Sequence, residues 1–225
     1  MDRIDLTSKR IVITGGGGRL GARMVEEFAG RGADVVALVV SDAEARRVPQ
    51  VSGGSVTVKR ADLIVESSVV ACFEEIGDEF GRIDALVHTV GMWSASPLLQ
   101  TTQEDWDLML QVNLTSTFLC FREAVRLIKS GRGTLVGISS RQGVDGGVAE
   151  QSAYSAAKAG VARLVESVAA EFGSSDIFAH AIAPSTIRFD GEGGGVHASD
   201  IVDLVAYLIV HGAALSGSTL RAYGV

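Results

Sequence analysis

Residues 10–21 read Arg-Ile-Val-Ile-Thr-Gly-Gly-Gly-Gly-Arg-Leu-Gly, a short β-branched run that passes directly into a glycine-rich loop. Arg10–Thr14 predicts a strand, and Leu20, Met24 and Phe28 predict the apolar stripe of a following helix. Glycines at such a turn let the backbone approach a pyrophosphate, whose charge then faces the helix N-terminus. A glycine run also makes ordinary turns, so the rest of the chain must decide between the two interpretations.

The rest of the chain alternates short apolar runs with helical patterns. The further runs are Asp34–Val40, Val56–Lys59, Ile83–Thr89, Gly133–Ser139, Ile177–Ala183 and Ser218–Ala222. They are continuous rather than alternating, which is typical of strands covered on both faces. This order predicts one α/β domain over residues 1–225, doubly wound, with a mostly parallel seven-stranded sheet and helices on both faces. Ligands of such folds bind at the carboxyl ends of the strands.

Composition narrows the class of protein. The chain has 225 residues, 20 Lys+Arg against 27 Asp+Glu and a formal net charge of −7 without a basic cluster, so nucleic acid is not an expected partner. Hydrophobic residues make up 47%, which excludes intrinsic disorder. Cys72 and Cys120 lie in apolar patterns without metal-ligand spacing, which indicates free thiols in a reducing compartment and no metal site. The N-terminus is charged and the longest uncharged runs contain polar residues, so we expect a soluble, cytoplasmic protein without a membrane span.

The glycine-rich loop and the end of the third strand predict a dinucleotide site. Because the loop follows the first strand of an alternating chain, dinucleotide binding is favoured over an ordinary turn. Asp62, with Leu63, follows the third strand and could accept a hydrogen bond from an adenine amino group; alternatively, Asp62 caps the next helix. The candidate contacts in the loop are Thr14, Gly15, Gly18, Arg19, Leu20 and Gly21.

The end of the second strand bears on which dinucleotide binds. An acid there would bind the ribose 2′-hydroxyl of NAD and repel the 2′-phosphate of NADP. The chain has Val39, Val40 and Ser41 at this point, and Asp42 one residue later. Arg19 could reach a 2′-phosphate, with the Ser41 hydroxyl as a second donor. We therefore expect NADP(H) to be preferred, and NAD(H) bound through Asp42 is the alternative.

Polar residues with a chemical pattern occur in the second half of the chain. Tyr154 and Lys158 stand at i and i+4 of one predicted helix, and therefore on one face. Ser139 and Ser140 end the strand before this helix, and Asn113 lies in the helical segment before that strand. A neighbouring ammonium lowers the pKa of a phenol, and a serine hydroxyl can hold a carbonyl oxygen. This combination suits proton transfer coupled to hydride transfer.

With these motifs the chain resembles the short-chain dehydrogenase/reductase family, close to its carbonyl- and ketoacyl-reductase-like branch. The resemblance runs essentially from end to end and implies a Rossmann-type fold. It implies that Tyr154 is the acid/base and that Ser140 binds the carbonyl group. Lys158 would bind the nicotinamide ribose and tune Tyr154, while Asn113 would hold a water of the proton relay. For the cofactor site the resemblance also includes Gly91, Pro184 and Ile187.

Several positions depart from the family pattern. Arg19 replaces the middle glycine of the loop, which then resembles the Gly-x-x-Gly-x-x-Gly of atypical members. The family's Asn-Asn-Ala-Gly segment is His88-Thr89-Val90-Gly91 here, so we expect the loss of amides that brace the adenine–ribose region. His88 itself is interpreted as a strand-end residue bonded to backbone rather than a catalytic base. Ser185 replaces a glycine, and Phe189 stands where a threonine often lies near the nicotinamide carboxamide.

The segment after the sixth predicted strand is unusually short. In the family it usually forms a helical lid, but here only about residues 188–198, rich in glycine, precede the next helix, whose expected cap is Ser199. We expect a flexible loop and an open cleft, suited to a bulky, polycyclic or carrier-held ketone or closed by a partner subunit. Met92 and Trp93 either line this cleft or serve only packing.

Together these observations predict an NADPH-dependent ketoreductase that interconverts a carbonyl and a secondary alcohol on a small-molecule substrate. The alternatives are an NAD-dependent alcohol dehydrogenase and a catalytically idle dinucleotide-binding sensor or structural subunit. From the resemblance we expect a homodimer or homotetramer, in which the helical segments Thr102–Lys129 and Gln151–Phe172 pack against a second copy.

Overall fold

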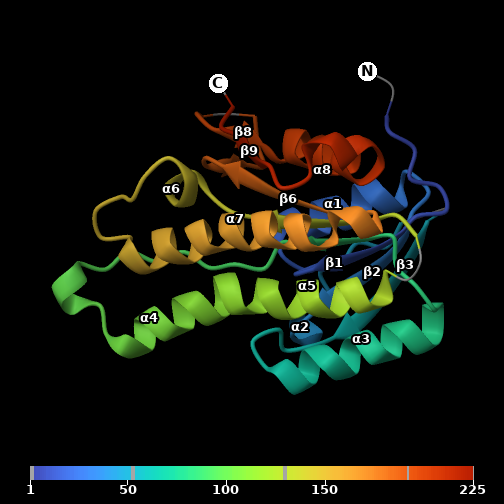
Figure 1. Ribbon diagram of the computed structural model, residues 1–225, viewed down its shortest axis with the longest axis horizontal. Coiled ribbons are helices and arrows are strands. Elements are labelled where there is room, and N and C mark those ends of the chain that lie inside the picture. The colour runs from blue at the N-terminus through green and yellow to red at the C-terminus, as the bar shows by residue number, and fades with distance from the viewer. Residues whose placement is uncertain (1–2, 52–53, 129–130, 192, 225) are drawn as a thin grey trace.

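Seven parallel strands form the central sheet of the protein (Figure 1). The computed structural model describes residues 3–51, 54–128, 131–191 and 193–224. The sheet order is β3-β2-β1-β4-β5-β6-β9, which confirms the predicted doubly wound, Rossmann-type α/β fold. Each strand of this sheet overlaps a predicted one: β1 has the predicted bounds, and the other six differ from theirs by one or two residues at an end. The bounds are β1 Arg10–Thr14, β2 Asp34–Val39, β3 Ser55–Arg60, β4 Ala85–His88, β5 Gly133–Ile138, β6 Ile177–Pro184 and β9 Thr219–Ala222.

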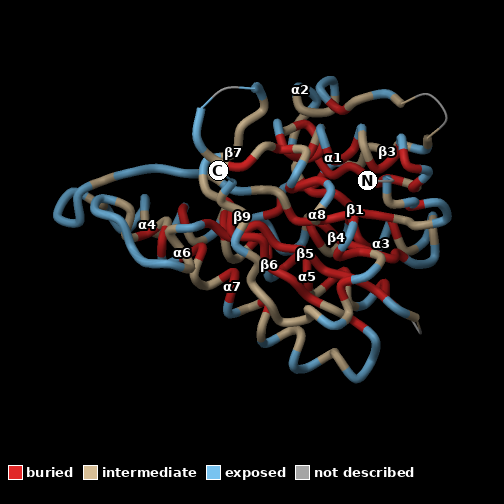
Figure 2. Tube along the Cα trace, turned by 90° about the horizontal axis from the view of Figure 1, so that it is seen from above, coloured by how far each residue is buried: buried red, intermediate tan, exposed pale blue. Residues whose placement is uncertain are grey.

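Helices cover both faces of the sheet, as the continuous apolar runs predict. Ile11 and Ile13 of β1 belong to a core shared with α1 (Arg19–Ala29) and α8 (Ala198–His211). Val12 points to the other face, into a core shared with α3 (Glu66–Phe80), α5 (Ser116–Leu127) and α7 (Ser152–Phe172). Figure 2 shows the buried residues concentrated along the strands and the inward sides of these helices. A strand buried on both faces needs apolar residues at consecutive positions.

Shorter elements connect the main ones. Helices α4 (Gln103–Leu110) and α6 (Arg141–Val144), with the loops beside them, extend away from the sheet and are largely exposed (Figure 2). A π-helical turn, Gln111–Thr115, joins α4 to α5, and α2 (Asp42–Ala45) follows β2. Three 3₁₀ turns complete the order, at Leu98–Gln100, Gly173–Ser175 and Gly212–Leu215.

The short segment after β6 is more ordered at its ends than the flexible loop that the sequence predicts. Two-residue strands, β7 (Ile187–Arg188) and β8 (Val196–His197), pair in parallel. Gly195 lies so close to the Thr186 carbonyl that an added Cβ would come within 2.2 Å of its oxygen. Helix α8 begins at Ala198, so the prediction of Ser199 as its cap is wrong: His197 is the cap and accepts a hydrogen bond from the Ser199 amide. Glu192, part of the predicted lid, lies outside the described residues.

Three other predictions from composition can be compared with the structure. Cys72 and Cys120 are buried free thiols, and burial raises the pKa of Cys72 to about 11. Among the described residues, no cluster of His, Cys, Asp or Glu could hold a metal ion. The stretch Ala198–Leu215 is long and apolar enough to span a membrane by length and composition alone, but Ile201, Val205 and Leu208 are part of the core. Lys129, the last residue of one segment expected to pack in the oligomer, lies outside the described residues.

Candidate active site

The site lies at the carboxyl ends of β1 and β4, where the strand order reverses. After β1, Gly15 has a φ of +66°, which favours glycine, and the loop turns into α1. An added Cβ on Gly21 would lie 2.1 Å from the Gly15 carbonyl oxygen, so the helix and the loop can meet only because Gly21 has no side chain. The helix cap, Gly18, makes no side-chain hydrogen bond, which leaves the first amides of α1 free for an anion.

The last residue of β4 and the residue after it both contact Thr14, at the start of this loop. The Thr89 amide donates a hydrogen bond to Thr14 Oγ1 (3.1 Å), and Thr89 Oγ1 donates to the Thr14 carbonyl (2.6 Å). His88 bonds side chains rather than backbone, with Nδ1 3.1 Å from Thr14 Oγ1 and Nε2 3.0 Å from Ser116 Oγ. Burial lowers the pKa of His88 to about 3, so the ring is neutral and structural, as predicted. Thr89 and His88 thus fix Thr14 at the start of the glycine loop.

One cavity brings together the four predicted catalytic residues. It has a volume of about 520 Å³ and is open to solvent. Trp93, which is 59% exposed, is part of its wall. The cavity is lined by Asn113, Ser140, Tyr154 and Lys158, and also by four predicted cofactor contacts, Leu20, Gly91, Pro184 and Ile187. The structure also adds lining residues that the sequence did not single out: Thr89, Gln142, Gln151 and Thr186.

Tyr154 and Ser140 face each other across the junction of β5 and α7. Ser140 follows β5 and caps α6, accepting a hydrogen bond from the Gly143 amide at 3.2 Å. Burial raises the pKa of Tyr154, and the neighbouring Ser140 hydroxyl offsets part of this rise. The phenol therefore holds its proton at neutral pH. The adjacent Ser139 has a structural bond instead, because its Oγ donates to the Lys158 carbonyl at 2.7 Å.

Lys158 is a buried ammonium, only 5% exposed. Its Nζ donates a hydrogen bond to the Ile138 carbonyl at 2.8 Å, at the end of β5. Burial lowers the pKa of Lys158 to about 8, so the group is close to losing its charge near physiological pH. An added Cβ on Gly91 would come within 3.0 Å of Lys158 Nζ and 2.9 Å of Asn113 Oδ1. Gly91 therefore keeps a space in front of the ammonium.

Asn113 shapes the wall of the cavity through the backbone around it. It is fully buried in the π-helical turn between α4 and α5, a distortion that often marks functional sites. Its Nδ2 donates to the carbonyls of Met92 and Met109, both at 3.0 Å, and its Oδ1 accepts from the Met92 amide at 3.1 Å. These bonds fix the chain that follows β4 and carries Met92 and Trp93.

A second cavity, here called the adenosine cavity, lies between the glycine loop and the ends of β2 and β3. Its volume is about 190 Å³. The predicted contacts Gly15, Asp62 and Leu63 line it. Asp62 does not cap α3, whose cap is Val65, although Asp62 Oδ1 accepts from the Ile64 amide at 3.2 Å. Glu44 of α2 also lines this cavity. The sequence interpretation missed it, although Ser41-x-x-Glu44 is a capping signature that places a carboxylate there.

The predicted contacts for a 2′-phosphate are not brought together. Arg19 lies over the ring of Phe189, with its Cζ 4.1 Å from the ring centroid. The Ser41 hydroxyl caps α2 and accepts from the Glu44 amide at 3.3 Å. Neither side chain lines the adenosine cavity, and Asp42, the alternative acid, forms an ion pair with Arg60.

A glycine loop at the switch point of a doubly wound sheet, next to a cavity with Tyr, Lys and Ser, defines a nicotinamide-dependent oxidoreductase.

Comparison with known proteins shows the family to which this chain belongs. Residues 9–193 match the family model described as short chain dehydrogenase. A hydroxy(phenyl)methylsuccinyl-CoA dehydrogenase subunit from Thauera aromatica is 35% identical over 185 residues, 79% of this chain and 72% of that protein. A 3-oxoacyl-acyl-carrier-protein reductase from Vibrio cholerae is 30% identical over 83% of this chain and 77% of its own length.

Solved structures agree with the sequence relatives. A dehydrogenase/reductase from Sinorhizobium meliloti is 28% identical, superposes with a TM-score of 0.87 and covers 97% of this chain and 95% of its own. This chain therefore belongs to the short-chain dehydrogenase family and is an oxidoreductase. Members of this family use NAD(P), act on small molecules and are commonly oligomeric.

Proposed function

We propose that this protein transfers a hydride between a nicotinamide dinucleotide and a small molecule, interconverting a ketone and a secondary alcohol. The observation that carries the proposal is that Ser140, Tyr154 and Lys158 line one open cavity directly beside the glycine loop. When bound, the cofactor supplies or accepts the hydride. The chain's own residues must then hold the carbonyl oxygen and move one proton.

Each residue has a role that its surroundings suit. Tyr154, protonated because of its raised pKa, donates its proton to the carbonyl oxygen in the direction of reduction. The Ser140 hydroxyl holds the same oxygen by a hydrogen bond. Lys158 lines the same cavity, and its positive charge makes transfer of the phenolic proton easier. Asn113 shapes the wall of the cavity through its hydrogen bonds. It also holds a water of the proton relay, as the resemblance implies.

The glycine loop and the two cavities fit a dinucleotide. The uncapped N-terminus of α1 can accept the pyrophosphate, the space in front of Gly91 can admit the nicotinamide ribose, and the adenosine cavity can take the other end. The sequence favours NADP(H), through Arg19 and Ser41. NAD(H) is the second candidate, and Glu44 in the adenosine cavity is the observation that favours it.

The substrate side of the cavity is broad rather than sealed. The short segment between β7 and β8 carries no helix among its described residues. We therefore propose a bulky or carrier-held ketone as the substrate. The relatives named as acting on a CoA ester and on an acyl-carrier-protein thioester support this class without specifying the compound. Two buried free cysteines fit the expected cytoplasmic location.

Oxidation of NADH and NADPH with a panel of aromatic, polycyclic and thioester-linked ketones tests the proposal. Tyr154→Phe should lower turnover by about 10²–10⁴-fold while the dissociation constant of the cofactor stays the same. Tyr207→Phe on α8 is the matched control, because Tyr207 is 43% exposed and lines neither cavity. Tight cofactor binding without turnover of any ketone or alcohol would instead support the idle sensor or structural subunit.

A further inference from the structure

The adenosine cavity contains charge of one sign only. Its lining includes two carboxylates, Glu44 and Asp62, and no Lys or Arg among the described residues. We propose that Glu44 selects NAD(H) over NADP(H), because it lies where a 2′-substituent of the adenosine ribose would enter. This inference rests on the proposed function only in requiring that a nicotinamide dinucleotide binds.

Two hydrogen bonds hold Glu44 at the end of β2, one through its carboxylate and one through its backbone amide. Its Oε2 accepts from the Val40 amide at 3.0 Å, directly after the last residue of the strand. Its own amide donates to Ser41 Oγ at 3.3 Å. The short helix α2 therefore places an acidic side chain at the end of β2, where Val39 and Val40 supply none. A sequence alignment by position would not reveal this, because the acid comes from a later residue.

Helix α2 also packs directly on the glycine loop. An added Cβ on Gly17 would lie 2.4 Å from the Glu44 carbonyl oxygen, and Arg47 Nε donates to the Gly17 carbonyl at 3.0 Å. In doubly wound folds the adenosine ribose lies between this loop and the end of the second strand. Glu44 is thus fixed on the wall that the ribose would face.

The Glu44 carboxylate can accept further hydrogen bonds besides the one from the Val40 amide. An ionised carboxylate can accept about four hydrogen bonds, and the contact to Val40 uses one of them. Oε1 forms an ion pair with Arg47, whose Nη2 lies 3.7 Å away, and at this distance it does not use a hydrogen-bonding position. The side chain is 26% exposed, so it can accept a hydrogen bond from a ribose 2′-hydroxyl. A 2′-phosphate in the same place would meet a like charge.

Three cations that could reverse this preference already have partners. Arg19 stacks on Phe189, and Arg60 pairs with Asp42. Arg47 is the cation next to Glu44, and its guanidinium is bound to the glycine loop through Nε. A 2′-phosphate would have to draw one of these groups away from its partner.

Binding to the full chain tests the proposal without relying on turnover. We would measure dissociation constants of NADH and NADPH by fluorescence, and those of AMP and adenosine 2′,5′-bisphosphate by calorimetry. The wild type should bind NADH and AMP about tenfold or more tightly than their 2′-phosphorylated counterparts. Glu44→Gln keeps an acceptor for the Val40 amide and removes the charge, so it should shrink that ratio by about tenfold.

Glu26→Gln is the matched control, since it makes the same chemical change at a half-exposed acid of α1 that does not line the cavity, and it should leave the ratio unchanged. Equal melting temperatures of the three proteins would exclude a folding defect. A wild type that prefers NADPH, or a Glu44→Gln variant with the wild-type ratio, overturns the assignment of Glu44 and leaves the proposed function intact. Failure of both dinucleotides to bind overturns the proposed function together with this inference.

Discussion

At the scale of single residues, the departures from the family motif turn out to contact one another. Arg19 stands in place of a glycine and Phe189 in place of a threonine, and in the folded chain the guanidinium covers the ring at 4.1 Å. This contact joins the first residue of α1 to the segment that follows β7. A cation at the start of a helix is also well placed to meet a pyrophosphate.

Arg19→Ala should therefore weaken NADH and NADPH by similar factors, about two- to tenfold, because the missing charge faces the pyrophosphate that both share. Phe189→Leu is the companion variant, since it removes the ring and keeps the cation. Dissociation constants of both cofactors, measured by fluorescence, check this. A loss confined to NADPH would show that Arg19 binds the 2′-phosphate, as the sequence suggested.

Lys158 gives the site a pH dependence of its own. Its pKa is lowered to about 8 by burial, whereas the pKa of Tyr154 is raised by burial. The ammonium is charged below pH 8 and neutral above it, while the phenol keeps its proton throughout this range. We expect kcat/KM for ketone reduction to be level below pH 8 and to fall above it, as the ammonium loses its charge. A pH profile whose basic limb begins only well above the pKa of Lys158 would indicate that Tyr154 governs it instead.

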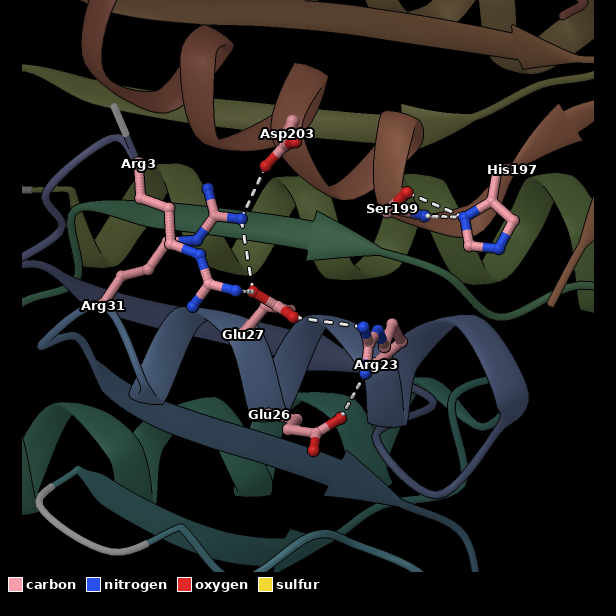
Figure 3. A network of polar contacts seen from close by, with 8 residues as sticks. All are labelled: Arg3, Arg23, Glu26, Glu27, Arg31, His197, Ser199 and Asp203. Atoms are coloured by element: carbon pink, nitrogen blue, oxygen red, sulfur yellow. Dashed lines mark hydrogen bonds and ion pairs between the residues drawn. The ribbon is translucent and has the colours of Figure 1, made fainter. Parts of the chain in front are cut away.

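At the scale of elements, ion pairs join the helix of the glycine loop to the last helix. Arg31, with a side chain only 5% exposed, contacts Glu27 of α1 at 3.4 Å and Asp203 of α8 at 2.5 Å (Figure 3). Arg23 also reaches Glu27, at 3.3 Å. Because α8 follows directly from β8, this network ties the dinucleotide loop to the segment over the substrate side.

Glu27→Gln should lower the free energy of unfolding by about 1–3 kcal/mol, because it leaves the buried Arg31 with less compensating charge. Glu26→Gln is the control one residue away. Glu26 is 54% exposed and forms a surface pair with Arg23, so the expected loss is below about 0.5 kcal/mol. Urea unfolding followed by circular dichroism measures both. Equal losses would mean that the network contributes no more than a surface pair.

The elements also show how far the sequence could predict this molecule. The strands were predictable because burial on both faces requires continuous apolar runs, as in Asp34–Val39. The cavity around Tyr154 was predictable because its residues follow strands of one parallel sheet. Strands β7 and β8 were not, since two residues carry no periodicity. Glu44 was missed for a related reason: its place at the end of β2 depends on a one-turn helix that folds back onto Val40.

At the scale of the whole molecule, α5 and α7 present an apolar groove on the outer side of the sheet. The groove has a volume of about 380 Å³, and its members include Phe118, Val125, Leu164, Val168 and Phe172. Phe118 is 44% exposed, with the Arg122 guanidinium 5.6 Å from its ring centroid. An exposed aromatic ring beside an apolar groove is typical of a surface that another chain covers. It lies within the segments expected to form the homodimer or homotetramer.

Phe118→Glu should dissociate the expected oligomer, a dimer into monomers or a tetramer into dimers, because a charge would have to be buried against the second copy. The substitution should leave the isolated fold stable, since Phe118 is already half-exposed. Tyr207→Glu on α8 provides the comparison, with an aromatic ring of nearly equal exposure, 43%, on the opposite face of the sheet. Light scattering after size-exclusion chromatography gives the mass of each variant. If Phe118→Glu and Tyr207→Glu each reduce a tetramer to dimers, each face of the sheet carries one interface. A wild-type mass for Phe118→Glu would contradict the predicted packing of α5 and α7.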